Sequence, residues 1–463
     1  MREAGDILLV ACYELGHQPL AVAWPAAFLE RAGYRPVLMD ISVEPVDEDT
    51  LARAKIIAVS VPMHTALRLG LEVAARARGV NPAAHICFFG LYATLNAEFL
   101  FASGVDRVIG GEAEAPLLAL IEALERGEAG AVPGVGRPAR PAAPHLRRLD
   151  FPVPSRAALP SIKKYAHLEH EGRMELTAYA EASRGCLHRC RHCPIPPVYG
   201  GRFFAVPREV VLADVRQQIA AGARHVTFGD PDFLNGPTHA LAVARDLHAE
   251  WPDVTFDFTA KIEHLLRHRA RLPALREAGC LFVVSAAESL SDTVLAHLDK
   301  GHTRADILTA LALTREAGIT LRPTWVAFTP WTTLDDHRAW LDFLAEEALI
   351  DHVDAVQYGL RLLVPPGSLL LESPAMRPHL GALEQATLSY TWTHPDPRMD
   401  RLQAATAAIV AKAIGMQADT PAIFDRVRAM AAEAAGAAAP APVRGAMPKD
   451  RRRPPRLSEA WFC

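Results

Sequence analysis

Strand-like and helix-like segments alternate through the middle of this chain, and no other feature constrains its fold as strongly. Short apolar runs are separated by stretches with helical spacing, such as ADILTALALTREAG. The predicted strands are 177–183, 225–230, 256–261, 281–289, 320–328 and 354–364. These β/α units predict a parallel sheet curled into a partial (β/α)6 barrel, where functional residues gather at the carboxyl ends of the strands.

A second alternation near the N-terminus predicts a separate α/β domain. Its strand-like runs, 7–15, 36–41, 55–62, 85–90 and 105–111, are typical of an open doubly wound sheet. We therefore expect five parts: the doubly wound domain at 1–130, a linker rich in proline and arginine at 131–174, the barrel at 175–375, a helical segment at 376–434, and a flexible tail at 435–463.

Composition limits the class of protein. The chain has 463 residues, half of them hydrophobic, and a formal net charge of −4, so it can bury sizeable cores and gives no reason to expect a nucleic-acid partner. It has no signal pattern and no apolar run of about 18 residues, so we expect a cytoplasmic protein without a membrane partner. Its seven cysteines are odd in number and scattered, which argues against a disulfide framework.

The array C-x3-C-x2-C, formed by Cys186, Cys190 and Cys193, carries the strongest chemical signal. A zinc site would need a fourth ligand from His188, His192 or a distant segment. Three thiolates can instead hold an iron–sulfur cluster and leave one iron open. The array resembles the signature of the radical S-adenosylmethionine (SAM) superfamily. The resemblance implies a 4Fe–4S cluster whose open iron chelates SAM, and a structural zinc knuckle is the alternative.

Polar residues at the ends of the predicted strands extend this resemblance. Gly229 and Asp230 close the second strand, where the superfamily has a glycine-rich turn with an acid that receives the amino group of SAM. The segment 287–303 resembles the one that holds the ribose and carboxylate of SAM. The implied SAM-binding residues are His192, Gly229, Asp230, Lys261, Ser285, Glu288 and Ser289. As alternatives, Asp230 and Glu288 are helix caps and His192 is a solvent-facing loop residue.

The N-terminal domain looks like the cobalamin-binding domain that precedes many radical SAM barrels. The cobalt-ligand motif D-x-H-x-x-G of that family is missing, because the first strand is followed by CYELGHQPL. His17 and His64 are candidate ligands, although such histidines are more often polar loop groups. We therefore expect a domain that shapes or roofs the active site, with bound cobalamin as the alternative.

Further segments resemble radical SAM proteins named for a CUAEP or CCAEP tail, among them CLHRCRHCPIPPVYGGRFF, TFGDPDFLNGP and WTHPDPRMD. In that family the tail continues past WFC with a second cysteine or a selenocysteine. We expect this chain to have been cut short at a selenocysteine codon that would follow Cys463, and a natural terminus is the alternative. The resemblance implies a catalytic role for Cys463, because vicinal thiols or selenols bind soft elements.

Three functions follow as hypotheses. A relative in this family, the radical SAM enzyme of arsinothricin synthesis, implies a transferase that moves the 3-amino-3-carboxypropyl group of SAM to arsenite, with flavodoxin or ferredoxin as reductant. The second hypothesis is a cobalamin-assisted or 5′-deoxyadenosyl-radical enzyme that methylates or rearranges an organic metabolite. The third is a metal-binding or sensor protein with a zinc knuckle.

Overall fold

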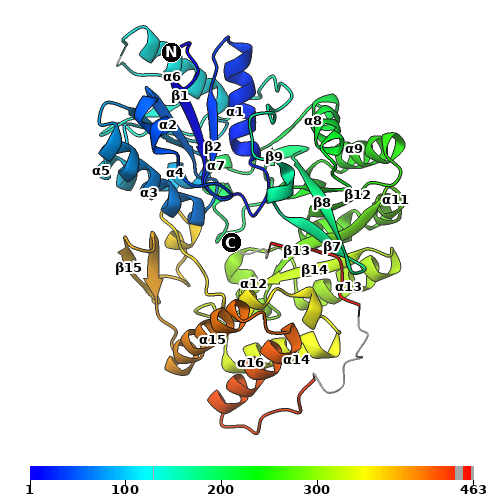
Figure 1. Ribbon diagram of the computed structural model, residues 1–463. Helices are drawn as coiled ribbons and strands as arrows, with labels where there is room; N and C mark the ends of the chain where they lie inside the picture. The colour runs from blue at the N-terminus through cyan, green and yellow to red at the C-terminus, as the bar shows by residue number, and fades with distance from the viewer. Residues whose placement is uncertain (129, 444–451, 460–463) are drawn as a thin grey trace.

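The computed structural model describes residues 1–128, 130–443 and 452–459. Two sheet-centred bodies make up most of the molecule, two long helices pack beside the second body, and a short hairpin lies between those helices and the first body (Figure 1). Within the described ranges, no helix is both long and apolar enough to cross a membrane.

The first domain is built on a sheet with the strand order β2-β1-β3-β4-β5-β6. Its strands are β1 (Ile7–Ala11), β2 (Val37–Asp40), β3 (Ile56–Ser60), β4 (His85–Phe89), β5 (Arg107–Ile109) and β6 (Val135–Gly136). Neighbouring strands are parallel except β5 and β6. Every residue of β1 and β3 is buried, as in strands covered on both faces. The strand order changes direction between β1 and β3, which confirms the predicted doubly wound fold.

Helices cover both faces of this sheet. They are α1 (Leu20–Arg31), α2 (Glu48–Arg53), α3 (His64–Val80), α4 (Leu91–Leu95), α5 (Ala97–Ala102) and α6 (Glu114–Glu125). Helix α1 follows Pro19, which offers no side-chain cap. Glu14 supplies it instead, accepting hydrogen bonds from Leu20 N at 3.2 Å and Ala21 N at 3.3 Å. The cap satisfies amides that the helix leaves unpaired and anchors the loop after β1.

The second body contains a sheet in the order β14-β13-β12-β11-β8-β7-β17. Its strands are β7 (His167–His170), β8 (Arg173–Ala180), β11 (His225–Phe228), β12 (Thr255–Thr259), β13 (Cys280–Glu288), β14 (Thr320–Trp325) and β17 (Arg456–Leu457). Strands β8 and β11 to β14 run parallel, and β7 and β17 extend the sheet in antiparallel fashion. The parallel part confirms the predicted partial barrel.

The sixth predicted strand, 354–364, does not join this sheet. Its first half is the 3-10 helix η5 (Ala355–Gly359), followed by an isolated bridge between Phe328 and Arg361. Gln357 explains the difference, because its Oε1 accepts a hydrogen bond from Trp325 N at 2.9 Å. A side chain thus satisfies part of the edge of β14 where a sixth strand would have paired.

The remaining helices connect and cover the barrel strands. They are α7 (Ile195–Tyr199), α8 (Arg208–Ala220), α9 (Pro237–Glu250), α10 (Ile262–Arg267), α11 (Leu272–Glu277), α12 (Asp292–Leu298), α13 (Arg304–Glu316) and α14 (Leu334–Glu346). The segment that we expected to be helical, 376–434, begins with a hairpin and then forms two helices. Its elements are β15 (Leu380–Glu384), β16 (Ser389–Trp392), α15 (Pro397–Gly415) and α16 (Thr420–Ala434).

The stretch 131–174, which we expected to be a linker, is tied to both sheets. It contributes β6 to the first and β7 to the second, and its Pro152 carbonyl accepts a hydrogen bond from Trp24 Nε1 at 3.0 Å. Phe151 is buried against the same tryptophan. The stretch therefore connects the two cores through specific contacts.

Part of the predicted tail is docked. Strand β17 pairs with β7, and Arg456 forms an ion pair with Glu169 at 2.6 Å. Glu459 accepts a hydrogen bond from Tyr13 Oη at 2.6 Å, so the chain reaches the loop after β1. The flexibility expected for 435–463 therefore does not extend to residues 456–459, because an open sheet edge and an ion pair hold them.

Candidate active site

The three predicted cluster cysteines lie in one loop beyond the carboxyl end of β8. The loop follows β9 (Ser183–Gly185) and is closed by β10 (Phe203–Ala205), which pairs antiparallel to β9. Gly185 directly precedes Cys186 and has a φ of 75°, and a Cβ there would lie 2.5 Å from Arg202 O. Only glycine fits this backbone, which turns sharply into the cysteine array.

The thiols of this loop have the character of metal ligands. Cys190 is buried, Cys186 and Cys193 are half-buried, and none of the described cysteines forms a disulfide. Burial raises the pKa of Cys186 to about 11 and that of Cys193 to about 12. Without metal Cys186 and Cys193 stay protonated at neutral pH, and cluster binding must displace their protons. Three soft donors in one loop fit a 4Fe–4S cluster with one open iron.

Glu288 at the end of β13 centres a buried charged group. Its φ of 63° is rare for a residue other than glycine, and the register of β13 against β14 shifts next to it. Its Oε1 lies 3.0 Å from His192 Nε2 and 3.1 Å from Lys300 Nζ. Burial acts to raise the pKa of Glu288, but the charges of Lys300 and His192 outweigh it and hold the pKa well below its usual range. Backbone strain beside a buried charge is typical of functional sites.

The two serines of the predicted SAM set differ in their bonding. Ser285 is fully buried in β13, and its Oγ has no hydrogen-bond partner among the described residues. Ser289 Oγ accepts a hydrogen bond from Ser291 N at 3.1 Å. A buried hydroxyl without a partner is costly, so Ser285 fits a site in which a bound ligand completes the hydrogen bonding.

Asp230 lies at the carboxyl end of β11 and is bound to the strand that leads into the cysteine loop. Its carboxylate accepts hydrogen bonds from Ala182 N at 2.9 Å and Ser183 Oγ at 2.6 Å. Burial raises its pKa to about 7. At the preceding Gly229, a Cβ would collide with the Tyr179 hydroxyl, so the close packing of this turn requires glycine.

Lys261 contacts the cysteine loop. Its Nζ lies 3.3 Å from His188 Nδ1 and 3.4 Å from Glu263 Oε2. Among the predicted SAM residues, Glu288 and His192 form one contact group, and Lys261 belongs to another. Both groups include a histidine of the cysteine loop, His192 in the first and His188 in the second.

The loop after β5 of the first domain packs on the cysteine loop through buried ion pairs. Arg184 of β9 lies 3.0 Å from Glu112, 2.6 Å from Glu114 and 3.2 Å from Glu181. Tyr199 of α7 donates a hydrogen bond to Glu112 at 2.8 Å. The carboxyl edge of the first sheet is therefore held against the cluster loop. Neither Arg184 nor Lys300 was singled out from the sequence, because each depends on partners distant in the chain.

The two histidines considered as cobalt ligands are engaged elsewhere. The His17 ring stacks on Tyr179 with centroids 4.4 Å apart, and burial lowers its pKa to about 3. His64 Nε2 is bonded to the Thr387 carbonyl. Ser60, at the carboxyl end of β3, has a buried hydroxyl with no partner among the described residues, which suits a ligand at this edge. The contacts therefore fit a cofactor bound without a histidine ligand from these loops. Cys463 lies outside the described residues.

Family models match both bodies. Residues 7–121 match the B12 binding domain, and residues 181–342 match the radical SAM superfamily. The second match implies a 4Fe–4S cluster and SAM as cofactors. The B12-binding match favours bound cobalamin. From the missing motif we had expected a domain that shapes or covers the active site without this cofactor.

Curated relatives match over part of their length. A tRNA-2-methylthio-N(6)-dimethylallyladenosine synthase of Chlorobium luteolum is 32% identical over 38% of this chain and 40% of its own. A ribosomal protein uS12 methylthiotransferase, RimO, of Geobacter sulfurreducens is 28% identical over 39% of this chain and 42% of its own. An uncharacterized methyltransferase of Pyrococcus horikoshii is 23% identical over 60% of this chain and 61% of its own. The chain thus spans less than two thirds of these relatives.

Solved structures share most of this fold. The cobalamin-dependent SAM radical enzyme OxsB, bound to aqua-cobalamin and SAM, aligns with a TM-score of 0.70 at 17% identity, covering 89% of this chain and 67% of that one. The radical SAM methyltransferase TsrM of Kitasatospora setae aligns with a TM-score of 0.60 at 18% identity, covering 74% and 73%. This chain therefore combines a B12-binding domain with a radical SAM barrel.

Proposed function

We propose that this chain is a cobalamin-dependent radical SAM enzyme that methylates or rearranges a small organic metabolite. The observation that carries the proposal is the ion-pair contact of Arg184 with Glu112 and Glu114. It joins the entrance of the cluster loop to the carboxyl edge of the first sheet. A cofactor bound at that edge and SAM bound at the cluster would therefore be neighbours. The relatives named as methyltransferases and methylthiotransferases support group transfer.

The chain's own residues have distinct roles in this proposal. Cys186, Cys190 and Cys193 hold the cluster, and a flavodoxin or ferredoxin serves as reductant. When bound, the cluster and SAM supply reductive cleavage of SAM, and cobalamin supplies a carrier for a methyl group. Glu288 stays ionised between His192 and Lys300, so it can accept hydrogen bonds from ribose hydroxyls.

Gly229, Asp230, Ser285 and Ser289 complete the proposed SAM site. The buried Ser285 hydroxyl has no partner among the described residues and would bond to a polar atom of the ligand. Asp230 keeps its strand end in place and, with its pKa raised to about 7, is able to hold or release a proton near neutral pH. Lys261 neutralises Glu263 beside the cluster loop.

A second candidate is transfer of the 3-amino-3-carboxypropyl group of SAM to arsenite. The contact between Glu459 and Tyr13 favours it, because it holds the tail at the loop after β1. Cys463 follows four residues later, and an extended stretch of that length reaches about 13 Å. In this candidate Cys463 binds the soft element and delivers it to the site.

The products of SAM distinguish the two candidates. The full chain is reconstituted anaerobically with iron, sulfide and hydroxocobalamin, reduced, and incubated with SAM. We expect bound cobalamin, and 5′-deoxyadenosine or S-adenosylhomocysteine as products by mass spectrometry. Methylthioadenosine as the main product, increasing with arsenite, would overturn methylation in favour of carboxypropyl transfer. Deletion of residues 457–463 should then abolish the arsenite effect and leave basal SAM cleavage unchanged.

A further inference from the structure

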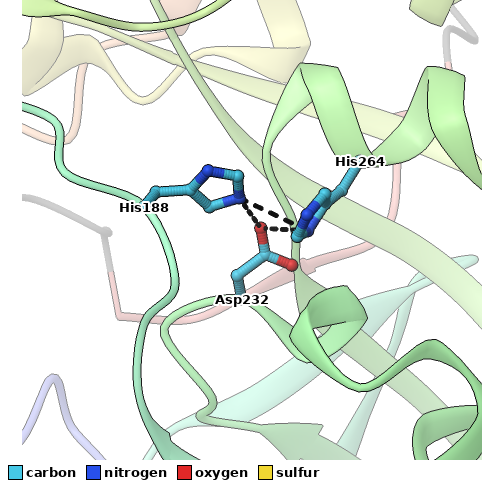
Figure 2. Close-up of side chains that lie close together, drawn as sticks. All are labelled: His188, Asp232 and His264. Atoms are coloured by element: carbon cyan, nitrogen blue, oxygen red, sulfur yellow. Dashed lines mark hydrogen bonds and ion pairs between the residues drawn. The ribbon is translucent and has the colours of Figure 1, made fainter. Parts of the chain in front are cut away.

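Three metal-ligating side chains converge beside the cluster loop, each from a different part of the chain. His188 lies within the cysteine array, Asp232 follows β11, and His264 lies on α10 (Figure 2). Figure 2 shows both imidazole rings directed at the Asp232 carboxylate. The three segments follow β9, β11 and β12, so the group joins the cluster loop to the carboxyl edge of the barrel.

The distances within this group suit one shared ion. His188 Nε2 lies 3.5 Å from His264 Nδ1 and 3.5 Å from Asp232 Oδ2, and His264 Nδ1 lies 2.9 Å from the same oxygen. Ligand atoms placed about 2.1 Å from a tetrahedral zinc ion are about 3.4 Å apart. A single ion can therefore reach all three atoms without any large movement of the backbone.

The carboxylate is held in place by the backbone around it. Asp232 is 1% exposed and His264 3% exposed. Asp232 Oδ1 accepts a hydrogen bond from Leu234 N at 2.9 Å, and Oδ2 accepts one from Lys261 N at 3.1 Å. Such outer hydrogen bonds orient a metal-binding carboxylate and lower the cost of assembling the site.

The charged side chains next to the group are Lys261, Glu263 and Arg267, which also pairs with Glu263. Lys261 Nζ lies 3.3 Å from His188 Nδ1, but Glu263 Oε2 lies 3.4 Å from the same ammonium and 3.8 Å from His188 Nδ1. An ion on Nε2 requires a proton on Nδ1, so His188 would then donate to Glu263 while Lys261 turns aside. Carboxylates commonly orient metal-bound histidines in this manner.

We propose that His188, Asp232 and His264 bind one divalent transition-metal ion of the zinc class, separate from the iron–sulfur cluster. Two imidazoles and one carboxylate are the donor set that such ions prefer. The ion ties the cysteine loop to two other strand ends. This inference is independent of the substrate and of the bond of SAM that is cleaved.

Metal counting on the full chain tests the proposal. The protein is reconstituted with iron and sulfide, exposed to Zn²⁺, desalted, and measured by mass spectrometry of the metals. We expect about one zinc per chain in addition to the cluster iron. His264→Gln should lose zinc by at least tenfold and keep its iron, whereas His248→Gln, the same change on α9, should keep both. Equal zinc in the parent chain and His264→Gln overturns the proposal.

Cobalt provides a second readout that does not depend on variant folding. Co²⁺ bound by nitrogen and oxygen gives visible bands without the charge-transfer band of thiolate ligands. We expect these bands in the parent chain with its cluster intact, and we expect Zn²⁺ to displace them. Asp232→Asn should weaken Co²⁺ binding, and Glu263→Gln should weaken it about 10- to 100-fold. Cobalt bands that carry thiolate charge transfer, or no bands at all, contradict the proposed site.

Discussion

The carboxyl edges of the two sheets present different chemistry. The barrel edge carries reactive and charged side chains, including three thiols and the group formed by Glu288, Lys300 and His192. In the first sheet, β3 ends at the small residue Ser60, and the small residue Gly90 follows β4. The comparison teaches that motifs detect a site built from reactive side chains more readily than one shaped by small residues and backbone.

Gly90 illustrates the second type of site. Its φ is 106°, and a Cβ would lie 3.0 Å from Val61 O. Any side chain here would strain the backbone and push against β3. A single glycine does not form a recognisable motif, and the sequence favoured a domain without cobalamin because the D-x-H-x-x-G motif is missing.

Replacing Cys186, Cys190 and Cys193 with alanine should produce the largest effect. We expect iron to fall from about four per chain to near zero, and SAM cleavage to fall to background, because no thiolate remains to bind iron. Cys280→Ala, a buried cysteine of β13, is the matched control and should retain its iron. An unchanged iron content in the triple variant would contradict a cluster at the barrel edge.

Arg184→Met tests the contact between the two edges. The change leaves Glu112 and Glu114 buried without their cation, so we expect the free energy of unfolding to fall by about 3 kcal/mol. Arg126→Met is the control, because its pair with Glu128 is exposed and should contribute little to stability. If Arg184→Met and Arg126→Met lose equal free energy of unfolding in urea, the buried pairs of Arg184 do not contribute more than an exposed pair.

Glu288→Gln should weaken SAM binding at the barrel edge. It retains the shape of the side chain but leaves the Lys300 cation without its partner. We expect at least a tenfold loss of SAM affinity by equilibrium dialysis, with normal iron content. Glu277→Gln, an exposed acid at the end of α11, serves as the control. An unaltered affinity for SAM in Glu288→Gln would contradict the assigned role.

Gly90→Ala tests whether cobalamin binds at the carboxyl edge of the first sheet. We expect cobalamin affinity to fall about tenfold, since the positive φ and the approach to Val61 both oppose a Cβ. Gly79→Ala in α3 is the control, because a Cβ there meets nothing within 4 Å. Absorbance of bound cobalamin measures both, and iron should be unaffected. Equal retention of cobalamin would place its site elsewhere.

The smallest predicted effect is the pH dependence of stability due to Asp230. Burial raises its pKa to about 7, whereas the unfolded chain has a value of about 3.9. The folded state therefore holds a proton that the unfolded state has released, and stability falls as pH rises from about 4 to about 7. Asp230→Asn should reduce this loss of stability, as measured by the free energy of unfolding at pH 5 and pH 7.5. Parallel pH profiles for both proteins would be inconsistent with a buried carboxylate at this position.

Much of the fold was predictable because its signals are local. Runs such as ILLVA bury every residue of β1, and the spacing of apolar residues separates strands from helices. The predicted sixth barrel strand does not form, and the side chain of Gln357 instead accepts a hydrogen bond from Trp325 N at the edge of β14. Likewise, β17 pairs with β7 although nearly 300 residues separate them in the chain.

By itself, the sequence determined the two α/β domains, the cysteine array and the strand ends where polar residues gather, because periodicity and spacing act over short distances along the chain. The tertiary structure alone decided that Arg184 would meet Glu112 and Glu114, that Lys300 would neutralise Glu288, and that His188, Asp232 and His264 would converge. Those contacts join residues that are mostly far apart in sequence. Their geometry depends on how parallel strands align their carboxyl ends and on how two separate cores pack together.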